Sequence, residues 1–225
     1  QAIGAMAYGT QSIPKVYKIF GPGNQYVTAA KQAVSRENTA IDMPAGPSEV
    51  AILADQSCVP AFVACDLLSQ AEHGTDSQSI LITDDERIIE PVLQELNIQL
   101  ENSPRKQFAV ESLKHSKIIL VKNKKEMVAM INIYAPEHLI IATENYRQLA
   151  LEIENAGSIF LGNYTCESLG DYASGTNHTL PTNGWARAYS GVNLDAFVKK
   201  ITYQEISKEA LPVIGAAVVK MAEAE

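Results

Sequence analysis

The sequence predicts an α/β fold in which a Rossmann-like, largely parallel sheet is covered by helices and followed by a small C-terminal helical element. Short aliphatic and β-branched runs alternate with longer segments whose apolar residues recur with helical spacing. The short runs are almost continuously apolar, which is typical of strands buried on both faces of a parallel sheet. A chain of 225 residues, 46% hydrophobic and 20% charged, is long enough to bury such a core.

The individual elements follow from the same patterns. Six apolar runs, flanked by Gly, Pro, Asn or Asp, predict strands over residues 16–20, 49–54, 78–83, 117–121, 138–142 and 158–161. Helical spacing predicts a helix beginning near Val27 and further helices over residues 60–72, 88–100, 105–113, 125–133 and 147–155. In the helix over 60–72, Pro60 lies in the first turn and Asp55 or Ser57 is a candidate N-cap.

Two regions depart from this alternation. Residues 162–194 are dense in Gly, Asn, Thr and Ser and have almost no periodicity, and an irregular run of that length is usually functional or a linker. Residues 195–225 have a helical pattern throughout, and Thr202 to Glu205 resembles a capping box. We therefore expect an α/β body over residues 46–192 and a helical segment over residues 193–225.

The composition excludes several functional classes. A net charge of −8 and a pI near 5.1 argue against binding to a nucleic-acid backbone. No apolar stretch approaches the roughly 20 residues that a membrane span needs, and the first residues lack the basic region of a signal peptide. The three cysteines, Cys58, Cys65 and Cys166, form no CxxC pair, so reduced thiols in a cytoplasmic protein are the simplest interpretation.

Gly21–Asn24 (GPGN) stands between a predicted strand and a predicted helix. Glycines at this place allow backbone amides to approach a phosphate at a helix N-terminus, and Asn24 can cap the helix or contact a ligand. The motif is not the GxGxxG fingerprint, and a tight strand-to-helix turn explains it equally well.

Gln70 and His73 are three residues apart near the end of a predicted helix, so they share one face of it. An amide oxygen and an imidazole on one face could bind a metal, although zinc usually prefers nitrogen and sulfur donors. A capping histidine beside an exposed glutamine is the structural alternative. The neighbouring Glu72 and Asp76 are alternative ligands.

Glu137 and His138 are adjacent in YAPEHLII, where a strand is predicted to begin. A carboxylate and an imidazole are the minimal equipment for general acid–base chemistry near neutral pH. The side chains of neighbouring strand residues point to opposite faces. Both can therefore enter one pocket only if the backbone bends, and Pro136 could provide this bend. A structural histidine at the edge of a strand is the alternative.

The irregular region contains further polar candidates. Asp171 lies in a glycine-rich setting and is a plausible ligand or base, and His178 is equally plausible. The other candidates of this region are Glu167, Asn177 and Trp185. Ser48, in PAGPSE, does not belong to a GxSxG motif, which favours a turn or cap hydroxyl over a nucleophile.

The order of these motifs along the chain resembles histidinol dehydrogenase. The resemblance extends over all 225 residues and rests on KIFGPGN, AIDMPAGPSEV, DLLSQAEHGTDSQ, YAPEHLII, AGSIFLGNYTCESLGDYASGTNHTLPT and YQEISKEAL. It implies a cytoplasmic homodimer of Rossmann-like domains. Such an enzyme oxidises L-histidinol to L-histidine through the aldehyde, with two NAD molecules and a zinc ion, as the last step of histidine biosynthesis.

The resemblance also implies roles for individual residues. Gln70, His73 and Asp171 match zinc ligands of the family, and Glu137 and His138 match its catalytic pair. The positions that match substrate contacts are Ser48, Gln70, His73, His138, Asp171 and Glu225. Gln1 and Asn24 match residues on the NAD side, so residues 1–45 would be the tail of the NAD-side domain. His178 matches no family ligand.

The resemblance further implies that this chain is a fragment. The family chain is about twice as long, its fourth zinc ligand lies beyond Glu225, and its C-terminal segment completes the site of the neighbouring subunit. We therefore expect little activity and weak zinc binding from the chain alone. The alternatives are a non-catalytic α/β domain that binds a metal or nucleotide, and a zinc hydrolase using Glu137, which the absence of HExxH disfavours.

Overall fold

The computed structural model describes all residues from 1 to 225. The chain divides into two compact units, Gln1–Asn193 and Leu194–Glu225. No helix in either unit is both long enough and apolar enough to span a bilayer.

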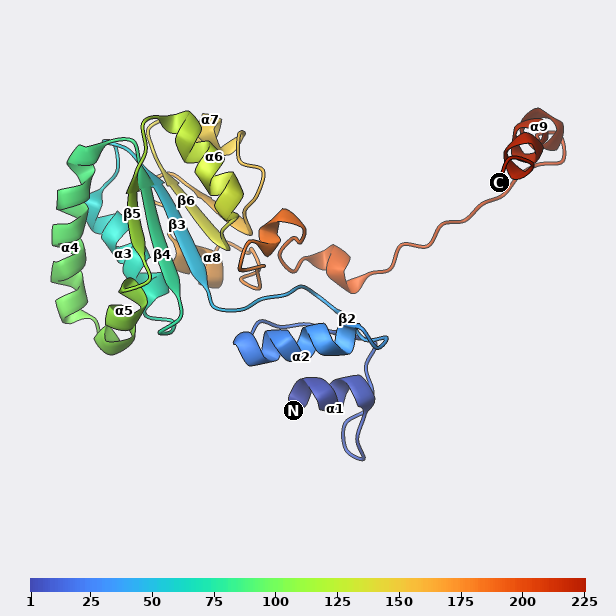
Figure 1. The fold of residues 1–225 in the computed structure, drawn as a ribbon, viewed down its shortest axis with the longest axis horizontal. Helices are drawn as coiled ribbons and strands as arrows, with labels where there is room; N and C mark the ends of the chain where they lie inside the picture. The colour runs from blue at the N-terminus through green and yellow to red at the C-terminus, as the bar shows by residue number, and fades with distance from the viewer. The chain divides into compact units, whose positions relative to one another are not determined.

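The first unit is built on a five-stranded sheet in which every neighbouring pair is parallel (Figure 1). Its strands, in the spatial order β5-β4-β3-β6-β7, are β5 (Lys117–Leu120), β4 (Gln78–Thr83), β3 (Glu49–Ala54), β6 (His138–Ala142) and β7 (Ser158–Leu161). Strand β3 comes first in the chain and lies at the centre of the sheet. The chain then adds β4 and β5 on one side of β3, followed by β6 and β7 on the other. All residues of β3 and β6 are buried, which confirms the prediction of a parallel sheet covered on both faces.

Helices cover both faces of this sheet (Figure 1). On one face lie α3 (Pro60–Ala71), α4 (Ile89–Asn102, preceded by the 3₁₀ turn Glu86–Ile88) and α5 (Lys106–Leu113). On the other lie α6 (Lys124–Tyr134) and α7 (Tyr146–Ala150). Val50, Ile52 and Ile140 pack toward α3, whereas Ala51, Leu53 and Leu139 pack toward α6. Because side chains alternate along a strand, His138 lies on the same face as Ile140.

Most predicted boundaries agree with the structure to within two residues, but two helices differ. The helix predicted over residues 147–155 ends at Ala150. Asp55 and Ser57 do not cap α3, whose N-cap residue is Val59. Asp55 instead accepts hydrogen bonds from the Ser57 backbone and hydroxyl and pairs with Lys124.

The prediction of a continuous helical region over residues 195–225 is wrong. The second unit contains a 3₁₀ turn, Leu194–Phe197, and one helix, α9 (Leu211–Ala222), and Thr202 begins no helix. None of the residues in these two elements is buried, and a short helix without tertiary packing is marginal in water. Pro212 lies in the first turn of α9, where its missing N–H carries no penalty, and this favours a helix start there.

The N-terminal residues form a small substructure of their own. Helices α1 (Ala2–Tyr8) and α2 (Gln25–Ser35) accompany a parallel pair of two-residue strands, β1 (Lys18–Ile19) and β2 (Ala40–Ile41). The strand predicted over residues 16–20 is therefore shorter. Asn24 is the N-cap of α2, since its Oδ1 accepts hydrogen bonds from the backbone N–H groups of Tyr26 and Val27.

A buried ion pair fixes the GPGN turn. Lys31 and Asp42 are in direct contact, and each side chain is only 1% exposed. The Lys31 ammonium also donates a hydrogen bond of 2.8 Å to the Gly21 carbonyl, while Asp42 accepts one of 2.7 Å from the Gly21 N–H. The pair therefore holds both backbone groups of the glycine that begins the turn.

Replacing Lys31 with Met should destabilise this N-terminal substructure by about 3–5 kcal/mol, because Asp42 would remain buried without its partner. Hydrogen exchange of the α2 backbone amides would measure the loss, and Lys125→Met, at an exposed position of α6, is the control. Unchanged protection of α2 in the Lys31 variant would contradict this role for the ion pair.

Candidate functional site

The order of strands and helices places the candidate residues at the amino-terminal edge of the sheet. Glu49 begins β3 and His138 begins β6, and Val50 pairs with His138 in the parallel register. Helix α3 runs back from the opposite edge, so Gln70 near its end returns to the same edge. Parallel sheets usually bind ligands beyond the carboxyl ends of their strands, so this arrangement is the opposite of the usual one.

The peptide of Glu49 contacts both members of the predicted catalytic pair. Its N–H donates a hydrogen bond of 3.0 Å to Glu137 Oε2, and its carbonyl oxygen lies 3.3 Å from His138 Nδ1. Glu137 Oε2 is itself 3.6 Å from His138 Nδ1. Glu137 precedes the strand, so its carboxylate reaches the imidazole although consecutive strand residues face opposite sides. The Ser48 hydroxyl also bonds to Glu137, which brings a third predicted residue to this place.

A loop from the irregular region contacts the side chain of the same residue, Glu49. The backbone N–H of Asn183 donates a hydrogen bond of 2.9 Å to Glu49 Oε1, and the N–H of Gly46 donates one of 2.6 Å to the Thr182 hydroxyl. Asn183 has a φ of 56°, in the left-handed region that Asn tolerates better than most residues. The irregular region is therefore ordered around the site.

His138 is held in its neutral form. Burial lowers the pKa of its imidazole to about 4, although the Glu49 carbonyl and the charge of Asp171 oppose the shift. The charges of His73 and His178 lower the pKa further, so the exposed His178 also lies near the site. The Nε2 atom of His138 is buried and has no hydrogen-bond partner.

Buried carboxyl groups surround the imidazole. Burial raises the pKa of Glu137 well above its ordinary value, and Glu167 and Glu49 raise it further. Burial raises the pKa of Glu49 to about 7, although hydrogen bonds from the backbone N–H groups of Asn183 and Glu137 act to lower it. It raises the pKa of Glu167 to about 8, with contributions from Asp171 and Asp66. Glu49 and Glu167 are therefore poised between their two protonation states near neutral pH.

Of the three predicted metal ligands, Gln70 and His73 are in contact with each other. Gln70 is fully buried, its Nε2 lies 3.4 Å from His73 Nδ1, and its Oε1 has no hydrogen-bond partner. No three His, Cys, Asp or Glu side chains are grouped so that they could hold a metal ion by themselves. A buried, unpartnered amide oxygen beside an imidazole nevertheless fits a cation, and Asp171 contributes the nearby negative charge.

Asp171 is positioned by α8 (Glu167–Tyr172), a helix within the irregular region. The backbone N–H of Glu167, its first residue, donates a hydrogen bond to the carboxylate of Asp66 on α3. Burial raises the pKa of Asp66 to about 6. Helix α3 thus carries Gln70, is followed two residues after its end by His73, and also holds the start of the helix that carries Asp171.

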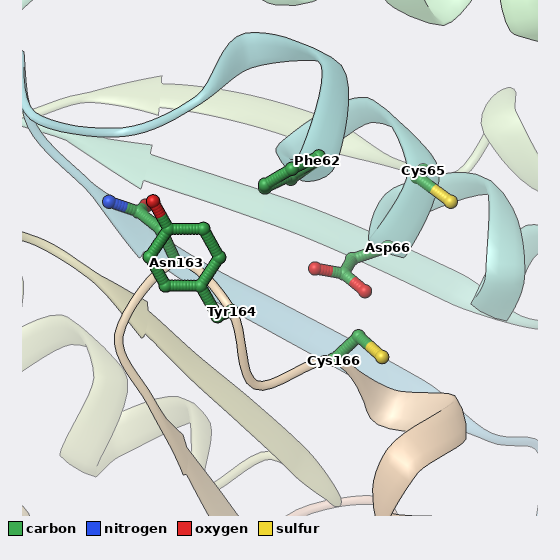
Figure 2. Close-up of a pocket in the computed structure, with 6 residues that line it drawn as sticks. All are labelled: Phe62, Cys65, Asp66, Asn163, Tyr164 and Cys166. Atoms are coloured by element: carbon green, nitrogen blue, oxygen red, sulfur yellow. The ribbon is translucent and has the colours of Figure 1, made fainter.

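A separate cavity of about 280 Å³ lies between α3 and the segment that follows β7 (Figure 2). Its lining residues are Phe62, Cys65, Asp66, Asn163, Tyr164 and Cys166. The rings of Phe62 and Tyr164 meet edge to face, with centroids 6.1 Å apart. All three cysteines are free, and burial raises the pKa of the Cys65 thiol, so burial disfavours its reactive thiolate form.

Two predicted residues, Gln1 and Asn24, lie in the N-terminal substructure of the first unit, and a third, Glu225, belongs to the second unit. Gln1 is the exposed N-cap residue of α1, and the side chain of Asn24 caps α2. Glu225 is exposed in the second unit. Glu49, Asp66 and Asn183 belong to no sequence motif that predicts a role for them. A glutamate at the first position of the otherwise apolar run EVAILA is the signal that could have indicated Glu49.

The pKa of Glu49 predicts an unusual dependence of stability on pH. Its folded value of about 7 exceeds the ordinary 4.5, so the unfolded state loses the proton first and Glu49 destabilises the fold as the pH rises. Glu49→Gln should reduce the loss of unfolding free energy between pH 5 and pH 8 by about 2–3 kcal/mol. Urea unfolding measures this difference, with exposed Glu90→Gln as the control. Equal pH dependence in Glu49→Gln and the parent chain would contradict it.

Comparison with known proteins identifies the relatives of this chain. It matches the sequence profile of the family described as histidinol dehydrogenase over residues 1–225. It is 64% identical over 225 residues to histidinol dehydrogenase of Bacteroides thetaiotaomicron and 54% identical over 228 residues to the chloroplastic enzyme of Oryza sativa. The matches cover 100% of this chain but 53% and 48% of those relatives.

Solved structures agree with the sequence comparison. The crystal structure of histidinol dehydrogenase from Elizabethkingia anophelis matches 100% of this chain and 52% of its own, with a TM-score of 0.96 and 58% identity. An acetylating aldehyde dehydrogenase from Geobacillus thermoglucosidasius, at 14% identity and a TM-score of 0.55, shares the fold alone. The chain belongs to the histidinol dehydrogenase family and spans about half the length of the relatives that it matches.

Proposed function

We propose that this chain forms part of a zinc- and NAD-dependent enzyme that oxidises L-histidinol to L-histidine through the aldehyde, in histidine biosynthesis. The observation that carries the proposal is the convergence of Glu137 and His138 on one peptide, that of Glu49, at the edge where Gln70 lies near the end of its helix. Membership in the family supports the substrate and the reaction class.

In this proposal His138 removes the proton of the substrate hydroxyl. Its Nε2 is buried and unpartnered, and the low pKa keeps it unprotonated at neutral pH. Each oxidation releases a hydride and a proton, and His138 accepts the proton at Nε2 as the hydride leaves carbon. The same transfer serves the alcohol in the first oxidation and the hydrated aldehyde in the second.

Glu137 activates the water that hydrates the aldehyde between the two oxidations. Its raised pKa makes its carboxylate a stronger base than that of an ordinary glutamate. The N–H of Glu49 and the hydroxyl of Ser48 bond to its carboxylate, so they orient it and stabilise its charged form.

Gln70, His73 and Asp171 would hold the zinc ion, and Ser48 and His138 would contact the substrate beside it. When bound, zinc supplies a template that orients the substrate nitrogens, and NAD accepts the hydride. We assign Gln1 and Asn24 to the NAD side and residues 1–45, 46–192 and 193–225 to three separate parts of the protein. In a cytoplasmic homodimer, Glu225 would contact the substrate of the neighbouring subunit.

The chain by itself should form little NADH from histidinol and hold less than one zinc ion, because it spans about half of its relatives. A chimera in which it replaces the matching half of the Bacteroides thetaiotaomicron enzyme should restore both. Metal analysis and NADH absorbance measure the two outcomes, with the unmodified relative as the reference. A chimera that folds and binds zinc without forming NADH would favour a non-catalytic metal-binding domain instead.

In that chimera, His138→Ala and Glu137→Gln should each lower turnover by ~10²–10⁴-fold, the usual contribution of a general acid or base. Zinc content should stay near that of the parent, because neither residue belongs to the proposed donor set. His115→Gln changes an exposed histidine and is the matched control. Near-normal turnover in either variant would exclude the role assigned to that residue.

A further inference from the structure

The contact between the Glu49 carbonyl and His138 constrains where the imidazole carries its proton. The two atoms, Glu49 O and His138 Nδ1, are 3.3 Å apart in a buried environment. A carbonyl oxygen can only accept, so this hydrogen bond requires a proton on Nδ1. A neutral imidazole with its proton on Nδ1 has its lone pair on Nε2.

The other neighbours of the ring agree with this assignment. Glu137 Oε2, at 3.6 Å, is a second acceptor facing the same Nδ1 atom. On the opposite side of the ring, Nε2 is buried and has no partner that would require it to donate. A proton on Nε2 would therefore leave a buried donor unsatisfied and bring the Nδ1 lone pair against two acceptors.

The position of this carbonyl is itself fixed from several directions. Glu49 pairs with Gln78 of β4, and its N–H donates to Glu137 Oε2. The residue is 7% exposed, and its Oε1 accepts the hydrogen bond from the Asn183 N–H in the loop that contacts it. One residue thus connects the central strand, this loop and both candidate catalytic side chains.

We propose that Glu49 is a positioning residue whose backbone carbonyl selects the Nδ1–H tautomer of His138, while its side chain, anchored by Asn183, holds that carbonyl in place. The tautomer leaves Nε2 as the atom that accepts a proton in the site. The use of that lone pair in histidinol oxidation rests on the proposed function, whereas the tautomer itself does not.

The tautomer can be measured on the 225-residue chain by NMR with ¹⁵N-labelled histidine, since the sequence contains four histidines. His138→Gln identifies the signals of His138 by their loss. At neutral pH we expect a protonated, pyrrole-like Nδ1 and an unprotonated, pyridine-like Nε2. A proton on Nε2, or a fully protonated ring, would overturn the proposal.

Variants separate the two acceptors that face Nδ1. In Glu137→Ala the Nδ1–H tautomer should persist, because the Glu49 carbonyl remains. Conversion to the Nε2–H tautomer in this variant would assign the selection to Glu137 and overturn the role of Glu49.

A second pair of variants tests the anchor. Glu49→Ala should give a mixture of tautomers, whereas Glu49→Gln, which keeps an oxygen for the Asn183 N–H, should retain Nδ1–H. A single Nδ1–H form in Glu49→Ala, or a mixture in Glu49→Gln, would exclude the anchoring role. Glu90→Ala, at an exposed position of α4, is the control. If Glu49→Ala does not fold, the parent chain, Glu137→Ala and Glu49→Gln still decide the proposal.

These spectra need neither zinc nor turnover. An inactive chimera with the expected Nδ1–H signal would contradict the proposed function and leave the positioning role intact. An active chimera with His138 protonated on Nε2 would support the proposed function and contradict the positioning role of Glu49.

Discussion

The parallel pairing of β3 with β6 is the constraint on which the site depends. It sets Val50 opposite His138, and this places the peptide of Glu49 between the two candidate catalytic side chains. At this edge the N–H of Glu49 bonds to the Glu137 side chain, and its carbonyl oxygen bonds to the His138 side chain. A shift of the register by one residue would move His138 to the α6 face of the sheet and away from Gln70. Packing in the centre of the sheet thereby determines geometry at its edge.

The fold was predictable where burial alone selects the structure. Strands such as 49–54 and 138–142 are continuous apolar runs, and no alternative buries them as well as a doubly covered sheet. The prediction failed for residues 195–225, where the sequence has helical spacing but the second unit buries none of its helical residues. Periodicity indicates which face a helix would bury, and it does not supply a surface for that face to pack against.

The site was predictable only in part, for a related reason. Glu137 and His138 are adjacent in the sequence and carry reactive side chains, so a motif could indicate them. Glu49 acts mainly through its backbone, and Asn183 reaches it across 134 positions of the chain through a backbone N–H. Neither interaction depends on a residue pattern that a single sequence displays. The edge of the sheet that carries the site was also undecided, because it depends on how far β6 extends before His138.

The buried charged residues of the first unit fall into two groups, one that stabilises the structure and one that lies at the site. Lys31 and Asp42 are buried together and compensate each other. Glu49, Asp66, Glu137 and Glu167 are buried, and no lysine or arginine ion pair in the chain includes any of them. Burial therefore raises each pKa, and their ionised forms reduce stability as the pH rises.

Buried acids without a cationic partner are concentrated at functional sites, where groups needed for binding or catalysis reduce the stability of the fold. A cation bound among them would favour their ionised forms and, by binding only the folded state, would stabilise the chain. The neutral imidazole of His138 cannot provide that charge, because its own pKa is lowered by the same burial. The acids whose ionisation weakens the fold at neutral pH would thus be the groups through which the binding of such a cation is coupled to folding.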